Sequence, residues 1–247
     1  MHVVKHHDAA CIEFFRRGAP LYGWLERSGN GTPIEAQLEV SELCLRNSCS
    51  ERNFKLLKRM RVDKHAETLL EQTREDAALG RMSAPQPLSQ IDTSLIAIAR
   101  RFGVEQGTKP DGTTKVRPVD DETAAGVNPA CAAAERLRVH GIDCLMALVK
   151  QFILALGCVP ALFKADVNAA YRRIPIRPEH RWAAWVAFGC ADAIMLSQHF
   201  AMMFGAAAAV HAWGRIGSLL TTLARRLLFI HVAATSTTTT QPIDQNA

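Results

Sequence analysis

Asp166 is the side chain whose type and position most clearly suggest chemistry. It stands near the end of an alternating apolar run, residues 161–167, which predicts a strand. A carboxylate at the end of an apolar strand must be hydrated or neutralised by a cation, because burying an isolated charge is very costly. The chain carries no phosphate-binding glycine loop, zinc-protease helix or nucleophile elbow. The search for a site therefore narrows to carboxylates at strand ends, with Asp166 first among them.

Basic side chains upstream of Asp166 form a second feature. The turn signal Pro110-Asp111-Gly112 predicts the tip of a hairpin whose return strand carries Lys115 and Arg117. A guanidinium fork matches the geometry of phosphate oxygens. The alternative interpretation is a solvated basic hairpin. Asp120 and Asp121, which follow on the return strand, are interpreted as hydrogen-bonding or capping residues.

Helices must position these residues. Apolar spacing predicts a helix over 53–80, ended by Gly80, and a short helix over 93–101, capped by Asp92 and ended by Gly103. A further helix over 143–156 is predicted to pack on a core through Leu145, Met146, Val149, Phe152 and Ile153.

The second half of the chain predicts one more strand and one long helix. The strand covers 182–188 and is expected to pair with the strand at 161–167. After Phe204-Gly205, an amphipathic helix is predicted from the spacing of Val210, Trp213, Ile216, Leu220, Leu223 and Leu227, with Arg215, Arg225 and Arg226 elsewhere around it.

The order of these segments resembles a known family. Lys164-Ala165-Asp166-Val167 with Tyr171 is similar to the first catalytic motif of the reverse transcriptases of retroelements. Lys115-Val116-Arg117-Pro118 resembles the fingers motif of that family, and Gln198-His199-Phe200 with Phe204-Gly205 resembles the motif that supports the template and the incoming nucleotide. The resemblance covers roughly residues 101–229. The last motif departs most from the family, because residues 206–209 are all alanine.

The resemblance implies a role for each matching residue. Asp166 would bind Mg²⁺ through its carboxylate and Val167 through its backbone carbonyl. Arg117, with Lys115, would neutralise the nucleotide triphosphate. Tyr171 would be the steric gate that favours deoxynucleotides, unless it is an ordinary buried tyrosine. Gly205 would allow close approach to the primer–template or nucleotide, or would serve as a strand-to-helix turn. Arg172, Arg173, Arg177 and Arg181 would touch the nucleic-acid backbone or solvate a surface.

One part of the family pattern is missing. Nucleotidyl transfer by two metal ions needs further carboxylates, which the family carries as paired aspartates on a hairpin after the long helix. After Phe204 the only acidic residue is Asp244, which lies in a polar threonine-rich segment. We therefore expect a truncated or frameshifted retroelement product, whose enzymatic status is uncertain and whose polymerase activity is absent or very low.

The expected fold class is α+β, with right-hand polymerase fingers and a partial palm behind a helical amino-terminal region. Residues 1–90 are interpreted as a helical, charged accessory region. Residues 91–234 would form the incomplete fingers and palm, and residues 235–247 a disordered threonine-rich tail.

Composition bounds the partners. A net charge of +5 permits contact with a polyanion without requiring it. The expected partners are an RNA or DNA template–primer and deoxynucleotides, and no protein partner is predicted. Seven scattered cysteines and the absence of a signal peptide favour an intracellular protein, cytoplasmic or nuclear. The only candidate membrane span, residues 193–214, contains two histidines, which argues against insertion.

Three hypotheses for function follow. The first is an incomplete RNA-directed DNA polymerase domain. The second is a non-catalytic remnant that binds nucleic acid through its basic fingers and palm surface, in which case salt should weaken binding steeply. The third is a small protein anchored in a membrane through residues 193–214.

Overall fold

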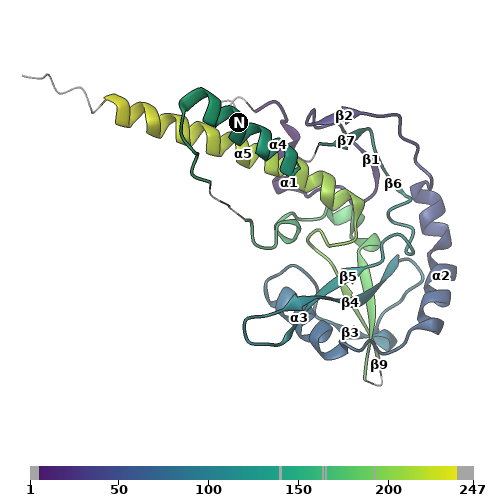
Figure 1. Cartoon of the computed structure of the whole chain (residues 1–247). Coiled ribbons are helices and arrows are strands. Elements are labelled where there is room, and N and C mark those ends of the chain that lie inside the picture. Colours follow the sequence, from purple (N-terminus) through teal and green to yellow (C-terminus); the bar gives the residue numbers. More distant parts are fainter. Residues whose placement is uncertain (1–5, 139–140, 163, 165, 192, 238–247) are drawn as a thin grey trace, which may run out of the picture.

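The computed structural model describes residues 6–138, 141–162, 164, 166–191 and 193–237. These residues form a mixed α+β fold (Figure 1), so the predicted fold class is confirmed at this level. The main sheet has five strands in the order β3-β9-β8-β4-β5. Their bounds are β3 Gln86–Pro87, β4 Ile98–Thr108, β5 Thr114–Asp120, β8 Trp185–Cys190 and β9 Ala193–Gln198.

The β4–β5 hairpin is the longest feature of the sheet. The two strands are antiparallel, with Arg101 opposite Asp120 and Val104 opposite Arg117. At the tip, the backbone N–H of Lys109 donates to the carbonyl of Thr113 at 2.8 Å, and Gly112 adopts a φ of 82°. Glycine tolerates this left-handed conformation without strain. The predicted hairpin is therefore confirmed.

The region predicted as one helix over 53–80 contains parts of two. Helix α2 runs over Glu42–Arg59 and α3 over Ala66–Ala78. Ser41 caps α2 by accepting the N–H of Cys44 at 3.2 Å, an earlier start than expected. Between the helices the chain is extended at Met60, and Val62 forms a bridge with Gly189 of β8. Tertiary pairing with the sheet thus breaks the helix, whereas Gly80, with φ of 68°, follows its end as predicted.

Two short ribbons tie the amino-terminal region to the segment after the hairpin. Strand β1 (Gly23–Leu25) pairs with β6 (Cys131–Ala133), and β2 (Gly31–Pro33) pairs with β7 (Glu135–Leu137). The first helix, α1 (Ala10–Arg17), packs against the last one, α5 (Ala207–Thr237). The main core accordingly mixes side chains from both ends of the chain, among them Leu21, Leu45, Ala99 and Met203.

Two predicted elements are wrong. The helix expected over 93–101 is replaced by the start of β4, because Ile98 pairs with Trp185 of β8 and Asp92 accepts the N–H of Ser94 in a turn. The strand expected over 161–167 is absent from the described residues of that segment, and Leu162 is exposed. Strand β8 already pairs with β4 on one side and β9 on the other, so the expected partner position is occupied.

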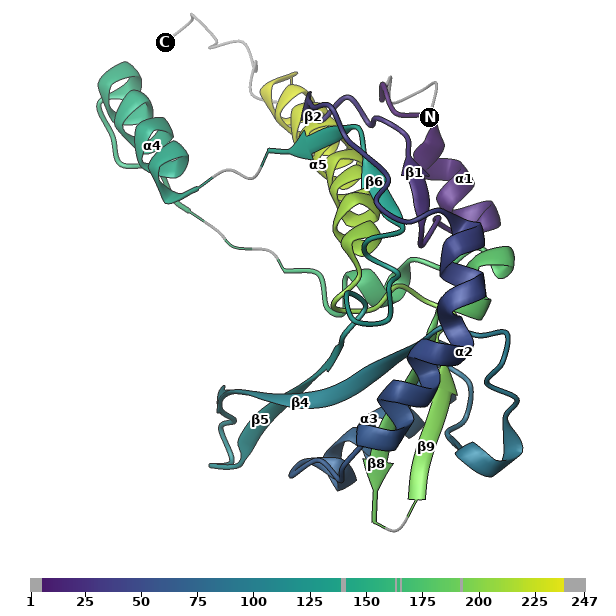
Figure 2. The same ribbon diagram turned by 90° about the vertical axis from the view of Figure 1, so that its right-hand side faces the viewer.

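Helix α4 (Ile142–Leu156) forms where it was predicted and ends at Gly157, which adopts the left-handed conformation. Its predicted packing is wrong, because none of its residues is buried. Figure 2 shows α4 standing apart from the sheet. Leu148 and Leu154 are 67% and 86% exposed.

Helix α5 confirms the predicted long helix after Phe204-Gly205. It packs through Ala208, Ala212 and Ile216, all buried. Residues 235–237 of the predicted tail belong to α5, and the rest of the tail lies outside the described residues. The stretch at 193–214 divides between β9, a loop and the first turns of α5. Within the described part of the chain, no helix is long and apolar enough to cross a membrane.

Candidate functional site

The best candidate site is a pocket between the β4–β5 hairpin, α3 and the segment that follows Asp166. We call it the hairpin pocket. Its volume is about 380 Å³. Its lining comes from four separate parts of the chain: Gln72, Glu75, Asp76, Leu79 and Arg81; Arg101 with Lys115, Val116, Arg117, Pro118 and Asp120; Asn168, Ala169 and Arg172; and Phe204. Segments that share the resemblance to reverse transcriptases therefore meet around one cavity.

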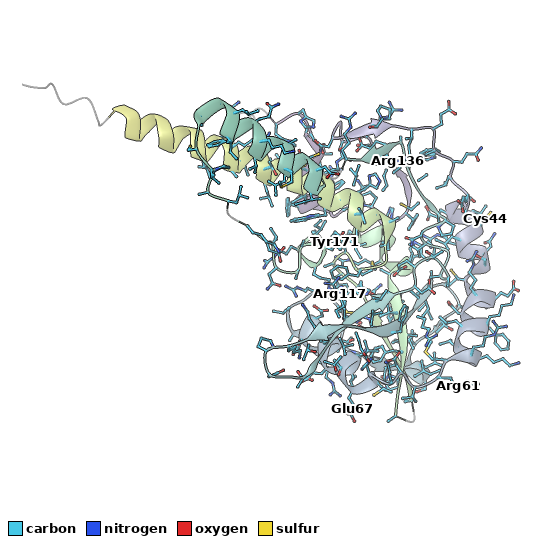
Figure 3. All side chains as sticks on the ribbon, in the orientation of Figure 1. Cys44, Arg61, Glu67, Arg117, Arg136 and Tyr171 are labelled. Carbon is cyan, nitrogen blue, oxygen red and sulfur yellow. The ribbon has the colours of Figure 1, made fainter. Side chains whose placement is uncertain are left out.

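Three side chains form a row at this pocket. The guanidinium carbon of Arg117 lies 4.7 Å from the centre of the Phe204 ring, a cation–π arrangement. The Tyr171 ring lies 5.1 Å from Phe204 on a tilt of 59°. Figure 3 labels Arg117 and Tyr171 in this part of the molecule. Arg117 is half-buried and Lys115, also at the pocket, is exposed. Arg117 and Tyr171, two of the predicted nucleotide-binding residues, thus both contact Phe204. Lys115 lines the same pocket as Arg117 and Phe204, whereas Tyr171 lies behind Phe204 and is not part of the lining.

Gly205 holds the turn that carries Phe204 to the pocket. Its φ is 106°, and a Cβ built on it would stand 2.0 Å from the backbone oxygen of Asp120. Only glycine fits there. Asn128 fixes the same turn, because its side-chain nitrogen donates to the carbonyl of Gly205 and its oxygen accepts the N–H of Ala207, both at 2.8 Å. The close approach that Gly205 makes in this structure is to Asp120, so here it serves the turn into α5.

Asp166 and Val167 directly precede two residues that line the hairpin pocket, but they do not line it themselves. Both are exposed, and the next two residues, Asn168 and Ala169, reach the lining. Ala169 has a φ of 53°, a conformation that costs energy for any residue with a Cβ. No group of three or more acidic, histidine or cysteine side chains suited to a metal ion occurs among the described residues. Asp166 therefore belongs to no such group among the described residues.

A buried charged network forms the floor of the hairpin pocket. Arg101 donates two hydrogen bonds to Asp120, at 2.8 and 3.0 Å, and a third to Thr73. His199 lies 2.9 Å from the second oxygen of Asp120. Arg172 donates to the other ring nitrogen of His199 at 2.6 Å and to Asp76 of α3. Every charge in this floor is paired, as buried charges require.

The contacts of His199 fix its proton. Arg172 donates to Nδ1, so that nitrogen carries no hydrogen, and Nε2–H donates to Asp120. Burial and the charge of Arg172 lower the pKa of His199 to about 4. Although burial disfavours the charged carboxylate, Arg101 and His199 more than offset it and hold the pKa of Asp120 below its usual value. At neutral pH the network holds a neutral imidazole and an ionised carboxylate.

Sequence reasoning identified only part of this network. Asp120 and Asp121 were interpreted together as hydrogen-bonding or capping residues. This is confirmed, since Asp120 accepts from Arg101 and Asp121 accepts the N–H of Ala124. Arg172 was expected on a surface and is instead buried, because Asp76 and His199 satisfy its guanidinium. His199 was predicted only as part of a motif. Its burial has no signal in the sequence, because its partners lie 27 and 79 residues away.

Glu122 lies next to this network and is also buried. Neither of its side-chain oxygens has a hydrogen-bond partner among the described residues. Burial, together with the negative charge of Asp120, raises the pKa of Glu122 well above its usual value. Burial therefore favours the protonated form of the Glu122 carboxyl.

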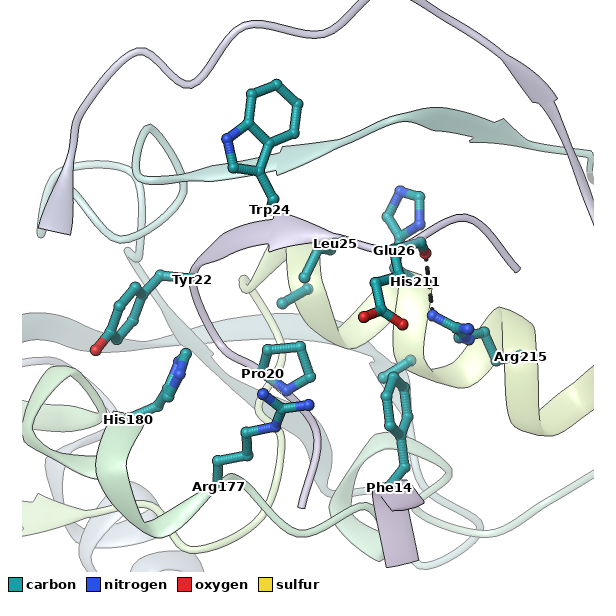
Figure 4. Close-up of a pocket in the computed structure, with 12 residues that line it drawn as sticks. Phe14, Pro20, Tyr22, Trp24, Leu25, Glu26, Arg177, His180, His211 and Arg215 are labelled. Atoms are coloured by element: carbon teal, nitrogen blue, oxygen red, sulfur yellow. Dashed lines mark hydrogen bonds between the residues drawn. The ribbon is translucent and has the colours of Figure 1, made fainter. Parts of the chain in front are cut away.

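A second cavity, about 200 Å³, lies between β1, α1 and α5 (Figure 4). The Tyr22 ring stacks on His180 with 4.0 Å between centres, and the Tyr22 hydroxyl accepts the indole N–H of Trp182. The Arg215 guanidinium on its wall is already paired with Asp8 and the carbonyl of Glu26. Of the residues given a role from the sequence, Arg177 lines this cavity, whereas Lys115, Arg117, Asp166, Val167, Tyr171 and Gly205 do not.

The chain matches no protein-family model, and a search of curated proteins finds no similar sequence.

Proposed function

We propose that this chain is a fingers-and-palm unit resembling that of reverse transcriptases, which binds a deoxynucleoside triphosphate in the hairpin pocket together with an RNA or DNA template–primer. The observation that carries the proposal is the row Arg117–Phe204–Tyr171. These three residues come from three segments that each resemble a separate motif of that family. The right-hand polymerase fold of fingers and partial palm is part of the same proposal.

The roles of the lining residues follow from their chemistry. Arg117 presents a planar fork of donors suited to phosphate oxygens, and Lys115 adds a point charge beside it. Phe204 contacts both Arg117 and Tyr171, so it fixes the distance between the phosphate-binding side and the aromatic side of the pocket. In this proposal the Tyr171 ring crowds a ribose 2′-hydroxyl and favours deoxynucleotides. Glu75 and Asp76 line the α3 wall, where the charge of Asp76 is already paired with Arg172 and Arg81.

The magnesium ion implied by the family fits the described residues poorly. Asp166 offers one exposed carboxylate and Val167 one carbonyl, while the Asp120 carboxylate in the pocket floor is already bound by Arg101 and His199. Mg²⁺ bound at Asp166 would supply charge neutralisation for phosphate oxygens. We therefore propose that nucleotidyl transfer by this chain is absent or weak, with binding as its main property.

The second candidate function is a non-catalytic nucleic-acid-binding protein. It is favoured by one specific observation: among the described residues, Asp166 belongs to no group of three or more side chains suited to hold a metal ion. Both candidates share the basic hairpin. They differ in whether a nucleotide occupies the hairpin pocket.

Isothermal titration of dTTP in the presence of Mg²⁺ tests the first candidate. The variant Arg117→Gln should bind dTTP at least about tenfold more weakly, because a charge-assisted pair is lost. Arg136→Gln is the matched control, since Arg136 is an exposed arginine on β7 that does not line the hairpin pocket. Equal dTTP affinity of the wild type and Arg117→Gln would contradict nucleotide binding at this site.

Primer extension tests the activity. We expect little or no Mg²⁺-dependent product from the purified chain. Robust extension that Asp166→Asn abolishes would refute the proposal of weak catalysis and make Asp166 a catalytic residue.

A further inference from the structure

A second basic pocket lies beside helix α2, about 350 Å³ in volume. We call it the α2 pocket. Successive side chains of a strand point to opposite faces, so Arg101 enters the floor of the hairpin pocket whereas Arg100 reaches the α2 pocket. The lining consists of Arg52, Lys55, Leu56, Arg59, Met60, Ile98, Arg100, Ala124 and Ala125.

The α2 pocket carries uncompensated positive charge. Four of its described lining residues are cationic and none is acidic. Arg52, Arg59 and Arg100 form no ion pair with any described residue. Lys55 pairs with Glu51 at the rim, where both side chains are exposed and such a pair contributes little. Like charges placed this close repel each other, so an anion entering the pocket would relieve the repulsion.

One of these cations is held in place before any ligand binds. The Nε of Arg52 donates to Ser48 Oγ at 3.1 Å, one turn earlier on α2. The Arg52 guanidinium also lies against Gly126, where an added Cβ would stand 2.5 Å from Nη1 and where φ is 85°. Gly126 thus leaves the space that Arg52 occupies. A fixed guanidinium loses little freedom when it binds a phosphate.

The floor of the α2 pocket has a different character from its rim. Met60, Ile98 and Ala125 are buried apolar residues, and Leu56 is partly buried beside them. A cationic rim over an apolar floor fits one nucleotide unit, with phosphates on the rim and a base or sugar on the floor. A duplex keeps its bases stacked inside, whereas a single strand can present one.

We infer that the α2 pocket binds single-stranded nucleic acid, with phosphates on Arg52, Lys55, Arg59 and Arg100 and one nucleotide resting on the apolar floor. This site is separate from the hairpin pocket. It does not depend on nucleotide binding or catalysis there, and it gives the chain a grip on a strand on the other face of β4.

Fluorescence anisotropy with labelled oligo(U) and oligo(dT) tests the inference on the full chain. The triple variant Lys55→Gln/Arg59→Gln/Arg100→Gln should lose at least about tenfold in affinity. Its log–log salt dependence should also become shallower by about 2, because each single-strand phosphate contact contributes about 0.7. The control Arg16→Gln/Arg17→Gln/Arg136→Gln removes the same charge from exposed sites elsewhere and should bind as the wild type. Equal losses in the two triple variants, or no loss in either, would overturn the site.

Two further measurements keep the outcomes distinct. An oligo(U) containing 4-thiouridine should crosslink to the peptide that carries Leu56 and Met60, and crosslinks confined to the hairpin pocket would contradict the inference. If phosphatidylserine vesicles, and not oligonucleotides, lose binding to the triple variant, the surface recognises a membrane instead. Titration of dTTP reports separately on the hairpin pocket, and the triple variant should leave that affinity unchanged.

Discussion

The fold strongly favours the neutral form of His199. Its pKa is about 4 in the folded chain, against an ordinary value of 6.5. The folded chain therefore keeps the ring neutral while the unfolded chain takes up a proton as the pH falls below 6.5. The stability that His199 contributes is present above pH 6.5 and is lost progressively between pH 6.5 and 4.

The variant His199→Asn should weaken the dependence of the unfolding free energy on pH. Asparagine can still donate to Asp120 and accept from Arg172 but does not titrate. Between pH 7 and pH 4 the wild type should lose on the order of 3 kcal/mol more unfolding free energy than the variant. Urea denaturation at the two pH values measures this difference. The same pH dependence in both proteins would show that protonation of His199 is not linked to unfolding.

Single residues show where the sequence was informative about the site. The turn signal at 110–112 predicted the hairpin that carries Lys115 and Arg117, and the family resemblance alone singled out Tyr171. The structure places Lys115 and Arg117 in the lining of the hairpin pocket and the Tyr171 ring against Phe204 of that lining. The burial of Arg172 could not be predicted in the same way. Arginine is usually exposed, and its partner Asp76 lies 96 residues away, so only the folded chain reveals the pairing.

Among the elements, α1 and α5 are joined by a buried ion pair. Arg215 of α5 donates to both carboxylate oxygens of Asp8, at 2.7 and 2.8 Å, and to the carbonyl of Glu26. Asp8 also accepts the N–H of Ala10 at the start of α1. Only about 5% of either residue is exposed. The pair thus sets how the first and last helices meet.

Asp8→Asn should destabilise the chain by about 3–5 kcal/mol, because Arg215 would be left buried without its counter-charge. The double variant Asp8→Leu/Arg215→Met should recover most of that loss, since it leaves no unpaired charge. Thermal and urea denaturation compare the three proteins. Full stability of Asp8→Asn alone would indicate that Arg215 escapes to solvent when its partner is removed.

Local patterns predicted elements well where local forces decide them. The β4–β5 hairpin is set by its turn residues, and α4 by apolar spacing and Gly157. Local patterns gave wrong elements where pairing with a distant strand determines the secondary structure. Residues 98–101 have a pattern compatible with a helix but are extended because Trp185, Val186 and Ala187 of β8 pair beside them. The break at 60–65 has the same cause, the bridge between Val62 and Gly189.

In the molecule as a whole, α4 stands out because its helical pattern implies a partner that the described chain does not provide. Its fifteen residues contribute nothing to the buried core. Excising 142–156 and joining Gly141 to Gly157 through a glycine–serine linker should therefore leave the melting temperature unchanged within a few degrees. The same excision of α1, which buries Cys11 and Phe14, should unfold the chain.

Scanning calorimetry of the two deletions makes the comparison. A large fall in melting temperature on removal of α4 would mean that the helix is packed in solution. Analytical ultracentrifugation of the same variant reports whether the exposed leucines of α4 promote self-association.

The charged floor of the hairpin pocket holds the pocket walls together before any ligand binds. Arg101, Asp120, His199, Arg172 and Asp76 connect α3, the hairpin, β9 and the segment after Asp166. These walls cannot separate without exposing a buried charge from its partner, which would cost several kcal/mol. The entropic cost of ordering the pocket side chains is therefore incurred when the chain folds. An anion that binds later would enter a preformed cavity. Binding of the anion should therefore show only a small heat-capacity change, because no part of the chain folds when it binds.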